Sequence, residues 1–147
     1  MWITLAGSSW YAPDVADIGI DLDALLVIRV EGLVQAARAA DEMGRSNAFS
    51  LIVIDLGAPT RTTDRLPAAA LSRLSGLALS QDLAIVFLTC KASETTSISS
   101  LISLRVETRS TPCGGGAYRT EMRVVKDKRQ GPGAIHAEVC RAPAGVR

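Results

Sequence analysis

Aliphatic runs alternate with segments of helical periodicity between Trp2 and Cys90, and this alternation is what most constrains the fold of the chain. Four such runs predict short strands: Trp2–Leu5, Leu25–Val30, Ser50–Asp55 and Leu83–Cys90. The second and fourth runs are apolar on both faces, as strands of a sheet covered by helices require. The first half of the chain is therefore expected to form parallel α/β units.

The segments between these runs predict three helices. A short helix is expected after Pro13 and ends near Gly19. A second is expected over Glu31–Met43, where Gly44 is placed to stop it, and a third over Leu66–Leu79. The apolar positions that recur at helical spacing are Leu33, Val34, Ala37, Ala40 and Met43 in the second helix, and Leu71, Leu74 and Ala78 in the third.

After Cys90 the pattern changes to that of antiparallel strands. Lys91–Ser100 is polar and is expected to be a loop, whereas Leu101–Arg109 and Tyr118–Lys126 alternate with period two. The segment between them, Ser110–Ala117, contains a proline and three glycines and predicts a flexible turn or loop. An antiparallel hairpin follows, in which opposed Arg and Glu side chains contribute roughly 0.2–1 kcal/mol per pair. Ala134–Cys140 is the last expected strand.

Length and charge limit the classes of protein to consider. The 147 residues fit one domain with a single core, with residues 143–147 as a flexible tail. The 16 Lys and Arg residues nearly balance 15 Asp and Glu, so nucleic-acid binding would need a local basic patch. Apolar runs such as Leu51–Ile54 are far shorter than the roughly 20 residues of a membrane span. We expect no membrane association.

The cysteines and the single histidine indicate no metal site. Cys90, Cys113 and Cys140 match no zinc-binding spacing, and His136 has no second Cys/His pair nearby. An odd number of cysteines argues against a disulfide framework. The start of the chain does not have the pattern of a signal peptide. A reducing, cytoplasmic location is expected.

The order of these elements and several local strings resemble the core of a RecA-type ATPase, over nearly the whole chain. Ile18–Leu26 is similar to the segment that joins the second and third core strands of that family, and Ser50–Asp55 resembles its Walker B strand. Glu94–Thr96 falls where the family's second DNA-binding loop would be. The most specific string, Arg123–Lys128 with Gly131 and Pro132 after it, is similar to a Lys-x-Lys element that reaches the nucleotide of a neighbouring RecA subunit.

The resemblance implies a RecA-like mixed sheet flanked by helices, parallel in its N-terminal half and antiparallel in its C-terminal strands. It covers residues 1–142 as a degenerate domain, because no Gly-x-x-x-x-Gly-Lys-Ser/Thr motif occurs in the chain. The Walker A strand, loop and helix of the family would precede Trp2. Ser8 stands about where the family has its water-activating Glu, and Cys90 about where it has its phosphate-sensing Gln. ATP hydrolysis by this chain alone is not expected, and ATP with Mg²⁺ is a cofactor only if another chain completes the site.

The missing strand has a structural consequence. In the family it lies between the strands resembled by Leu83–Cys90 and Leu101–Arg109, so its loss exposes two edges. Those two strands could pair directly, a partner could supply a strand, or two copies could exchange elements. A further alternative is that the chain is a fragment of a longer protein.

Three groups of residues are candidates for binding. Asp55, Lys126 and Lys128 are degenerate nucleotide or phosphate contacts by the resemblance. Asp55 could equally cap a turn, and the lysines could be the solvated end of a hairpin. Possible DNA contacts are Lys91 and Arg129. Contact through the loop after Lys91 would be weak and salt-sensitive, because that loop has no aromatic residue on which a base could stack.

The third group is the N-terminal aromatic cluster, Trp2, Trp10 and Tyr11. Such residues are enriched at interface hot spots, so they could dock a partner. They could equally cover the core where the missing helix would have been.

Two RecA-related families have lost nucleotide chemistry in a similar way. ImuA-like proteins assist a translesion polymerase in damage-induced mutagenesis, and SulA inhibits cell division by binding FtsZ. The basic hairpin around Lys126 and Lys128 resembles the ImuA-like group, whereas the start at the second core strand resembles SulA. We expect a non-catalytic accessory protein of the bacterial DNA-damage response whose partner is RecA or a translesion polymerase complex. A SulA-like inhibitor and a RecA-type ATPase or recombinase fragment completed in trans are the alternatives.

Overall fold

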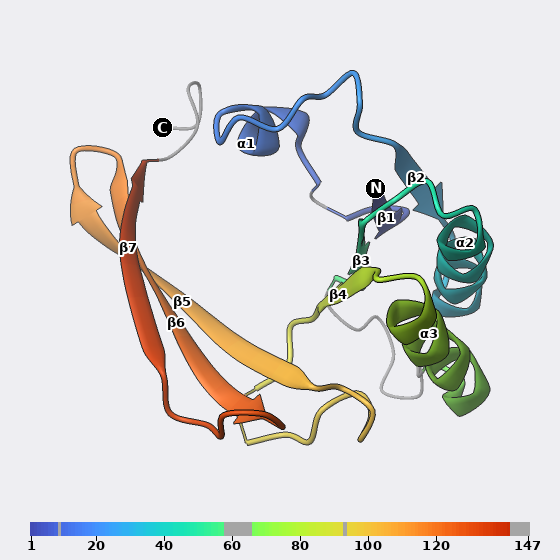
Figure 1. Cartoon of the computed structure of the whole chain (residues 1–147). Helices are drawn as coiled ribbons and strands as arrows, with labels where there is room; N and C mark the ends of the chain where they lie inside the picture. Colours follow the sequence, from blue (N-terminus) through green and yellow to red (C-terminus); the bar gives the residue numbers. More distant parts are fainter. Residues whose placement is uncertain (9, 58–65, 93, 142–147) are drawn as a thin grey trace. The chain divides into compact units, whose positions relative to one another are not determined.

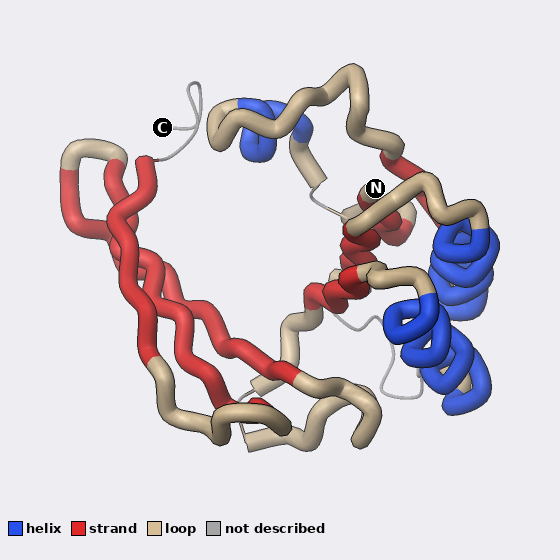
Figure 2. Tube along the Cα trace, viewed as in Figure 1, coloured by secondary structure: helices blue, strands red, loops and turns tan. Residues whose placement is uncertain are grey.

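The computed structural model describes residues 1–8, 10–57, 66–92 and 94–141 (Figures 1 and 2). The 143–147 segment, expected to be a flexible tail, lies outside these residues. The elements are β1 (Trp2–Leu5), α1 (Ala12–Ala16), β2 (Val27–Val30), α2 (Leu33–Arg45), β3 (Leu51–Asp55), α3 (Ala68–Ser80), β4 (Ala84–Leu88), β5 (Leu104–Gly114), β6 (Ala117–Asp127) and β7 (Ile135–Arg141).

The chain divides into two compact units. Unit 1 comprises residues 1–10 and 21–92, and unit 2 comprises residues 11–20 and the chain from residue 93 onward. Unit 1 therefore holds β1–β4 with α2 and α3, and unit 2 holds α1 with β5–β7.

Unit 1 is a parallel sheet with strand order β2-β1-β3-β4. Helices α2 and α3 lie next to each other on one face of this sheet (Figure 1). The aliphatic runs predicted as parallel strands are confirmed, the first with the predicted bounds and the other three with slightly narrower ones.

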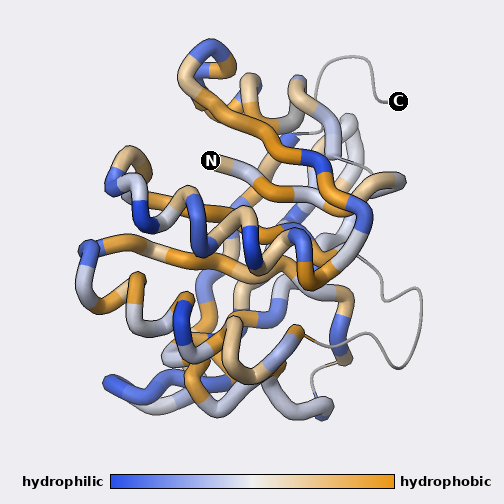
Figure 3. The backbone as a smooth tube through the Cα atoms, turned by 90° about the vertical axis from the view of Figure 1, so that its right-hand side faces the viewer, coloured by the Kyte–Doolittle hydropathy of each residue, from blue (hydrophilic) through white to orange (hydrophobic). Residues whose placement is uncertain are grey.

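The core of unit 1 lies between this sheet face and the two helices. Ile3, Ile52 and Ile54 are wholly buried there. Helix α2 covers them with small side chains, which let its backbone approach the strands closely. The outer side of α2 is charged, so hydrophobic and hydrophilic residues alternate along the helices in Figure 3. The buried residues of α2 are Ala36, Ala37, Ala40 and Gly44. In α3 the buried stripe is Ala70, Leu71, Leu74 and Leu77. Leu77 is therefore buried where Ala78 was predicted to be.

Gly44 has a different role from the predicted one. Helix α2 continues through it to Arg45, so Gly44 does not stop the helix. A Cβ atom added to Gly44 would lie 3.3 Å from the Cδ1 of Leu77 and 3.3 Å from the Cδ2 of Leu83. The absence of a side chain therefore serves the close contact between α2 and α3, which the sequence alone could not distinguish from a helix stop.

The opposite face of the parallel sheet carries no helix of unit 1, and we call it the helix-free face. Because strand residues alternate between faces, Trp2, Thr4, Val27, Arg29, Leu51, Val53, Val86 and Leu88 belong to it. Leu51 is 44% exposed, Val86 41% and Leu88 39%. The prediction that the fourth strand is buried on both faces is therefore wrong, because unit 1 supplies helices to one face alone.

Unit 2 contains an antiparallel sheet of order β5-β6-β7. The predicted cross-strand charge pairs are confirmed, since Glu107 lies opposite Arg123 and Arg109 lies opposite Glu121. The predicted Ser110–Ala117 loop is mostly strand. Pro112 pairs with Tyr118, and a register shift directly after Pro112 accommodates the missing N–H.

The two sheets are separate, and this corrects the expectation of one mixed sheet. Strand β4 lies at an edge of the parallel sheet and β5 at an edge of the antiparallel sheet. The expected alternative in which these two strands pair directly is not found among the strand pairings of the described residues. Among the described residues, no helix is both long and apolar enough to cross a lipid bilayer.

The packing at Gly44 generates a stability prediction with an internal control. Gly44→Val should lower the free energy of unfolding by about 2 kcal/mol, because the added methyl groups overlap Leu77 and Leu83. Gly76→Val, at a helical glycine with nothing near its added Cβ, should change it by less than about 0.5 kcal/mol. Urea unfolding followed by circular dichroism measures both. Equal losses for the two variants would contradict this account of Gly44.

Candidate functional site

The predicted site residues are divided between the two units. Asp55, Lys91, Trp2 and Trp10 belong to unit 1, whereas Lys126, Lys128, Arg129 and Tyr11 belong to unit 2. The candidate functional residues therefore form separate surfaces, each within one unit.

The first surface is the polar C-terminal end of the parallel sheet. Asp55 ends β3 and lies in register with Thr4 of β1 and Leu88 of β4. Its Oδ1 accepts a hydrogen bond from the N–H of Gly57 at 3.0 Å, so the carboxylate caps the turn that follows the strand. Thr4 is wholly buried, and its hydroxyl is hydrogen-bonded to that of Ser8.

This end of the sheet holds two of the residues that the resemblance relates to nucleotide chemistry, Asp55 and Ser8, whereas Lys126 and Lys128 belong to unit 2. Ser8 follows β1 and is tied to Thr4, and Thr4 is the register partner of Asp55. Thr4 was missed by sequence reasoning, although a hydroxyl residue inside the WITL strand is a usable signal. Hydroxyl groups and one carboxylate can orient water or a polar ligand. None of the three carries the positive charge that holds a phosphate.

The second surface is the pair of indoles on the helix-free face. The rings of Trp2 and Trp10 lie 6.4 Å apart between centroids at an interplanar angle of 56°. The guanidinium of Arg29 lies 5.9 Å from the centroid of Trp10, within cation–π distance. Both indole nitrogens are buried and have no hydrogen-bond partner among the described residues. Tyr11, in unit 2, is 51% exposed.

The third surface is the basic end of β6 in unit 2. The Nζ of Lys126 donates to the carbonyl of Ser100 at 3.4 Å, and the Nζ of Lys128 donates to the carbonyl of Leu101 at 3.5 Å. Arg105, directly opposite Lys126 in the sheet, donates from its Nη1 to the carbonyl of Thr95. These three cations hold the loop before β5 against the sheet.

An open depression of about 470 Å³ lies beside these cations, and we call it the basic depression. It combines two positive side chains with hydroxyl groups, which is chemistry suited to an anion such as phosphate. Its lining residues are Thr96, Ser97, Ser99, Ser100, Arg105, Val125 and Lys126. Sequence reasoning found Lys126 but missed Arg105, whose place opposite Lys126 follows from the strand register.

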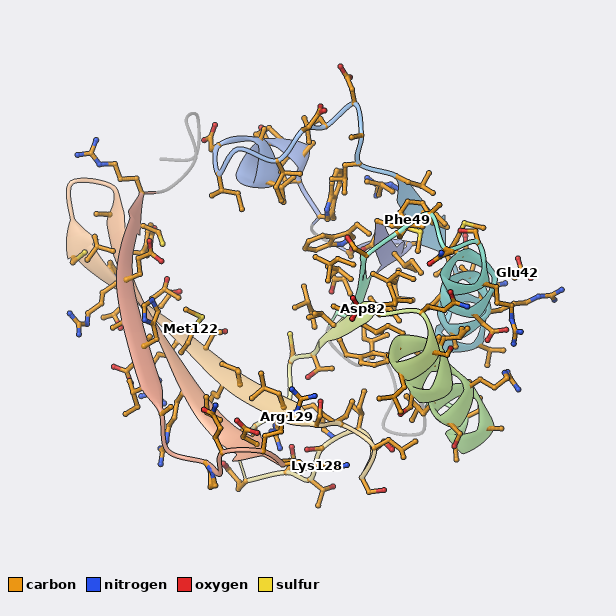
Figure 4. All side chains as sticks on the ribbon, viewed as in Figure 1. Glu42, Phe49, Asp82, Met122, Lys128 and Arg129 are labelled. Atoms are coloured by element: carbon orange, nitrogen blue, oxygen red, sulfur yellow. The ribbon has the colours of Figure 1, made fainter. Side chains whose placement is uncertain are left out.

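Asp127 shapes the turn that presents Lys128 and Arg129. Its Oδ1 accepts hydrogen bonds from the backbone N–H of Arg129 at 2.7 Å and of Gln130 at 3.2 Å. Both Lys128 and Arg129 are exposed, and they lie close together after the end of β6 (Figure 4). Arg129 is one of the two residues predicted from the sequence as possible DNA contacts. Lys91, the other predicted DNA contact, is exposed in unit 1 beyond the end of β4.

The residues considered for metal or nucleophilic chemistry lie apart. Within the part of the chain that is described, no three His, Cys, Asp or Glu side chains gather to hold a metal ion. Cys90, Cys113 and Cys140 are free and exposed. His136 is an exposed residue of β7 opposite Met122.

Comparisons with known proteins add no identity. No model of a known protein family matches the chain, and no curated protein is significantly similar to it. The fold and surfaces thus define a mixed α/β protein with a parallel sheet, a separate antiparallel sheet and a basic depression in the second unit.

The turn after β6 generates a prediction about its order. Asp127→Ala should speed hydrogen exchange at the amides of Arg129 and Gln130 several-fold, since each loses an acceptor worth about 1 kcal/mol. Asp127→Asn keeps an oxygen at the same place and should change exchange much less. Exchange followed by NMR measures both variants. An equal effect of the two would show that charge, not the hydrogen bonds, orders the turn.

Proposed function

We propose that the chain is a non-catalytic RecA-like accessory or regulatory protein of the bacterial DNA-damage response, most similar in role to the ImuA-like group. It acts by binding other proteins, with RecA or a translesion polymerase complex as partner. The proposal joins the resemblance of the sequence to the arrangement of strands.

The observation that carries the proposal is that the parallel strands and the antiparallel strands belong to two separate sheets. The resemblance puts the missing Walker A strand between the strands now seen as β4 and β5. These two strands lie at the edges of separate sheets. The strands up to β4 are parallel and those from β5 onward are antiparallel. This order supports a RecA-like core from which the Walker A strand is missing.

The hydrogen bonds of the residues that the resemblance relates to nucleotide contact support a non-catalytic role. Asp55 caps the turn at Gly57, and Lys126 and Lys128 donate to carbonyls of their own unit. A carboxylate and two ammonium groups used in this way stabilise local structure. Hydrolysis would need them aimed at Mg²⁺ and the β- and γ-phosphates.

Two surfaces are proposed to make the contacts. Tyr11, exposed in unit 2, is the aromatic anchor for a protein partner. The basic depression and Arg129 provide weak, salt-sensitive contacts to phosphate, including that of DNA.

The first experiment separates a binding protein from an ATPase completed in trans. Equilibrium dialysis of the purified chain against ATP and Mg²⁺ should show no saturable binding up to about 1 mM ATP. This limit corresponds to a binding free energy weaker than about −4 kcal/mol. Micromolar affinity for ATP would favour the ATPase. So would ATP hydrolysis that appears when RecA is added and is lost in the double variant Lys126→Met with Lys128→Met. Arg119→Met with Arg123→Met, which removes two positive charges from the strand that carries Lys126, is the matched control for charge.

The second experiment identifies the partner. Purified RecA, the translesion polymerase complex and FtsZ are each titrated against the labelled chain, and we expect binding to one of the first two. Tyr11→Ala should weaken that binding about tenfold or more, whereas Tyr118→Ala, an exposed tyrosine of the same unit, should not. Binding to FtsZ alone, with filamentation of cells that express the chain, would make it a SulA-like inhibitor.

A further inference from the structure

The free edge of β4 differs in composition from the other sheet edges. Natural edge strands are protected from pairing by charges, prolines or bulges. Strand β2 carries Arg29, β5 carries Arg105, Glu107, Arg109 and Pro112, and β7 carries His136, Glu138 and Arg141. Strand β4 reads AIVFL and has none of these protections.

The backbone of β4 has a defined set of groups at this edge. The N–H of Ala84 donates to the carbonyl of Ser50 at 2.9 Å, and the carbonyl of Leu88 accepts from the N–H of Leu56 at 3.1 Å. Because N–H and C=O directions alternate along a strand, Ala84, Val86 and Leu88 point their backbone groups toward β3. Ile85 and Phe87 therefore direct theirs to the free edge, where the described residues provide no neighbouring strand.

We propose that β4 pairs antiparallel with β4 of a second copy of this chain, across a two-fold axis at Val86. In this register Ile85 of each copy lies opposite Phe87 of the other. The two residues of such a pair exchange both of their backbone hydrogen bonds. The pairing thus satisfies every outward N–H and C=O of Ile85 and Phe87 and joins the two parallel sheets into one continuous sheet.

The charges beside β4 favour a second copy in this orientation. Asp82 lies before the strand, in the turn after α3, and Lys91 lies after the strand (Figure 4 for Asp82). Antiparallel pairing about Val86 puts Asp82 of one copy opposite Cys90 of the other and next to Lys91. Parallel pairing would put like charges together. Since the strand itself is uncharged, nothing on it repels its own copy.

The exposed side chains of β4 also fit such a contact. Val86 and Leu88 are 41% and 39% exposed on the helix-free face, in register with Val53 and Asp55 of β3. Pairing two copies brings Val86 against its own equivalent and Leu88 against Ala84. A five-residue strand pair covers much less than the roughly 1,200 Å² of a stable interface, so we expect a weak dimer that forms in the micromolar range.

Sedimentation equilibrium of the full chain, up to about 0.5 mM to suit a small interface, tests the dimer. Val86→Lys should weaken association about tenfold or more, because it sets like charges opposite each other at the axis. Val106→Lys is the matched control, since Val106 is also a strand valine and is 40% exposed, on the edge strand β5. A monomer at every concentration, or an equal loss for Val106→Lys, would overturn the proposal.

Cross-linking tests the register without depending on a charge. In a background with all three cysteines changed to serine, Val86→Cys should form a disulfide-linked dimer on oxidation. The opposed Cα atoms would lie about 4.5 Å apart in such a non-hydrogen-bonded pair, within the range that a disulfide spans. Ala84→Cys lies on the same face of β4 but opposite Leu88, so it should cross-link far less. Equal cross-linking of the two variants would exclude the proposed axis.

The dimer does not rest on the proposed function. Its two tests use the chain alone, whereas the proposed function is tested with ATP and with partner proteins. A monomer that binds RecA would overturn the dimer and leave the proposed function in place, with the β4 edge then left to a strand of another protein. A dimer that binds neither RecA nor the polymerase complex would support the proposed dimer and overturn the proposed function.

Discussion

The close packing of α2 and α3 onto a single face of the parallel sheet is the constraint on which the rest of unit 1 depends. Ala36, Ala40 and Gly44 keep α2 near the strands, so that the isoleucines of β1 and β3 are completely buried. This packing fixes the positions of β1 and β3. It thereby sets the strand ends at which Thr4 and Asp55 meet in register.

Using one face has consequences for the other. Parallel sheets are usually covered on both faces, and the sequence of this one has the apolar character of such a sheet. The helix-free face instead carries two indoles tilted against each other near β1 and exposed aliphatic side chains on β3 and β4. The exposed apolar side chains of this face thus arise from the same asymmetry that organises the core.

Much of the fold could be predicted from the sequence because strand and helix periods are local properties. The aliphatic runs located all the parallel strands, and alternation in β5 and β6 located their charge pairs. Gly44 was misread because a glycine ends helices as readily as it permits close packing, and the difference depends on residues distant in sequence such as Leu77 and Leu83. The strand at Ser110–Gly114 was missed because proline and glycine commonly mark loops, whereas here pairing with β6 holds them extended.

The candidate site was harder to predict than the fold. Asp55 was expected at a strand end and lies there, but Arg105 and Asp127 act through register and turn geometry that residue spacing alone does not reveal. The separation of Asp55 from the lysines into two units has no local signal at all.

The sheet of β5–β7 contains no buried residue among those described. Its strands are therefore held by backbone hydrogen bonds and cross-strand pairs more than by a core of their own. Substitutions at such exposed positions usually change stability by less than about 0.5 kcal/mol. Most single positions of this sheet should therefore tolerate exchange, so that its identity as a sheet resides in the alternating pattern and the turn glycines and not in particular amino acids.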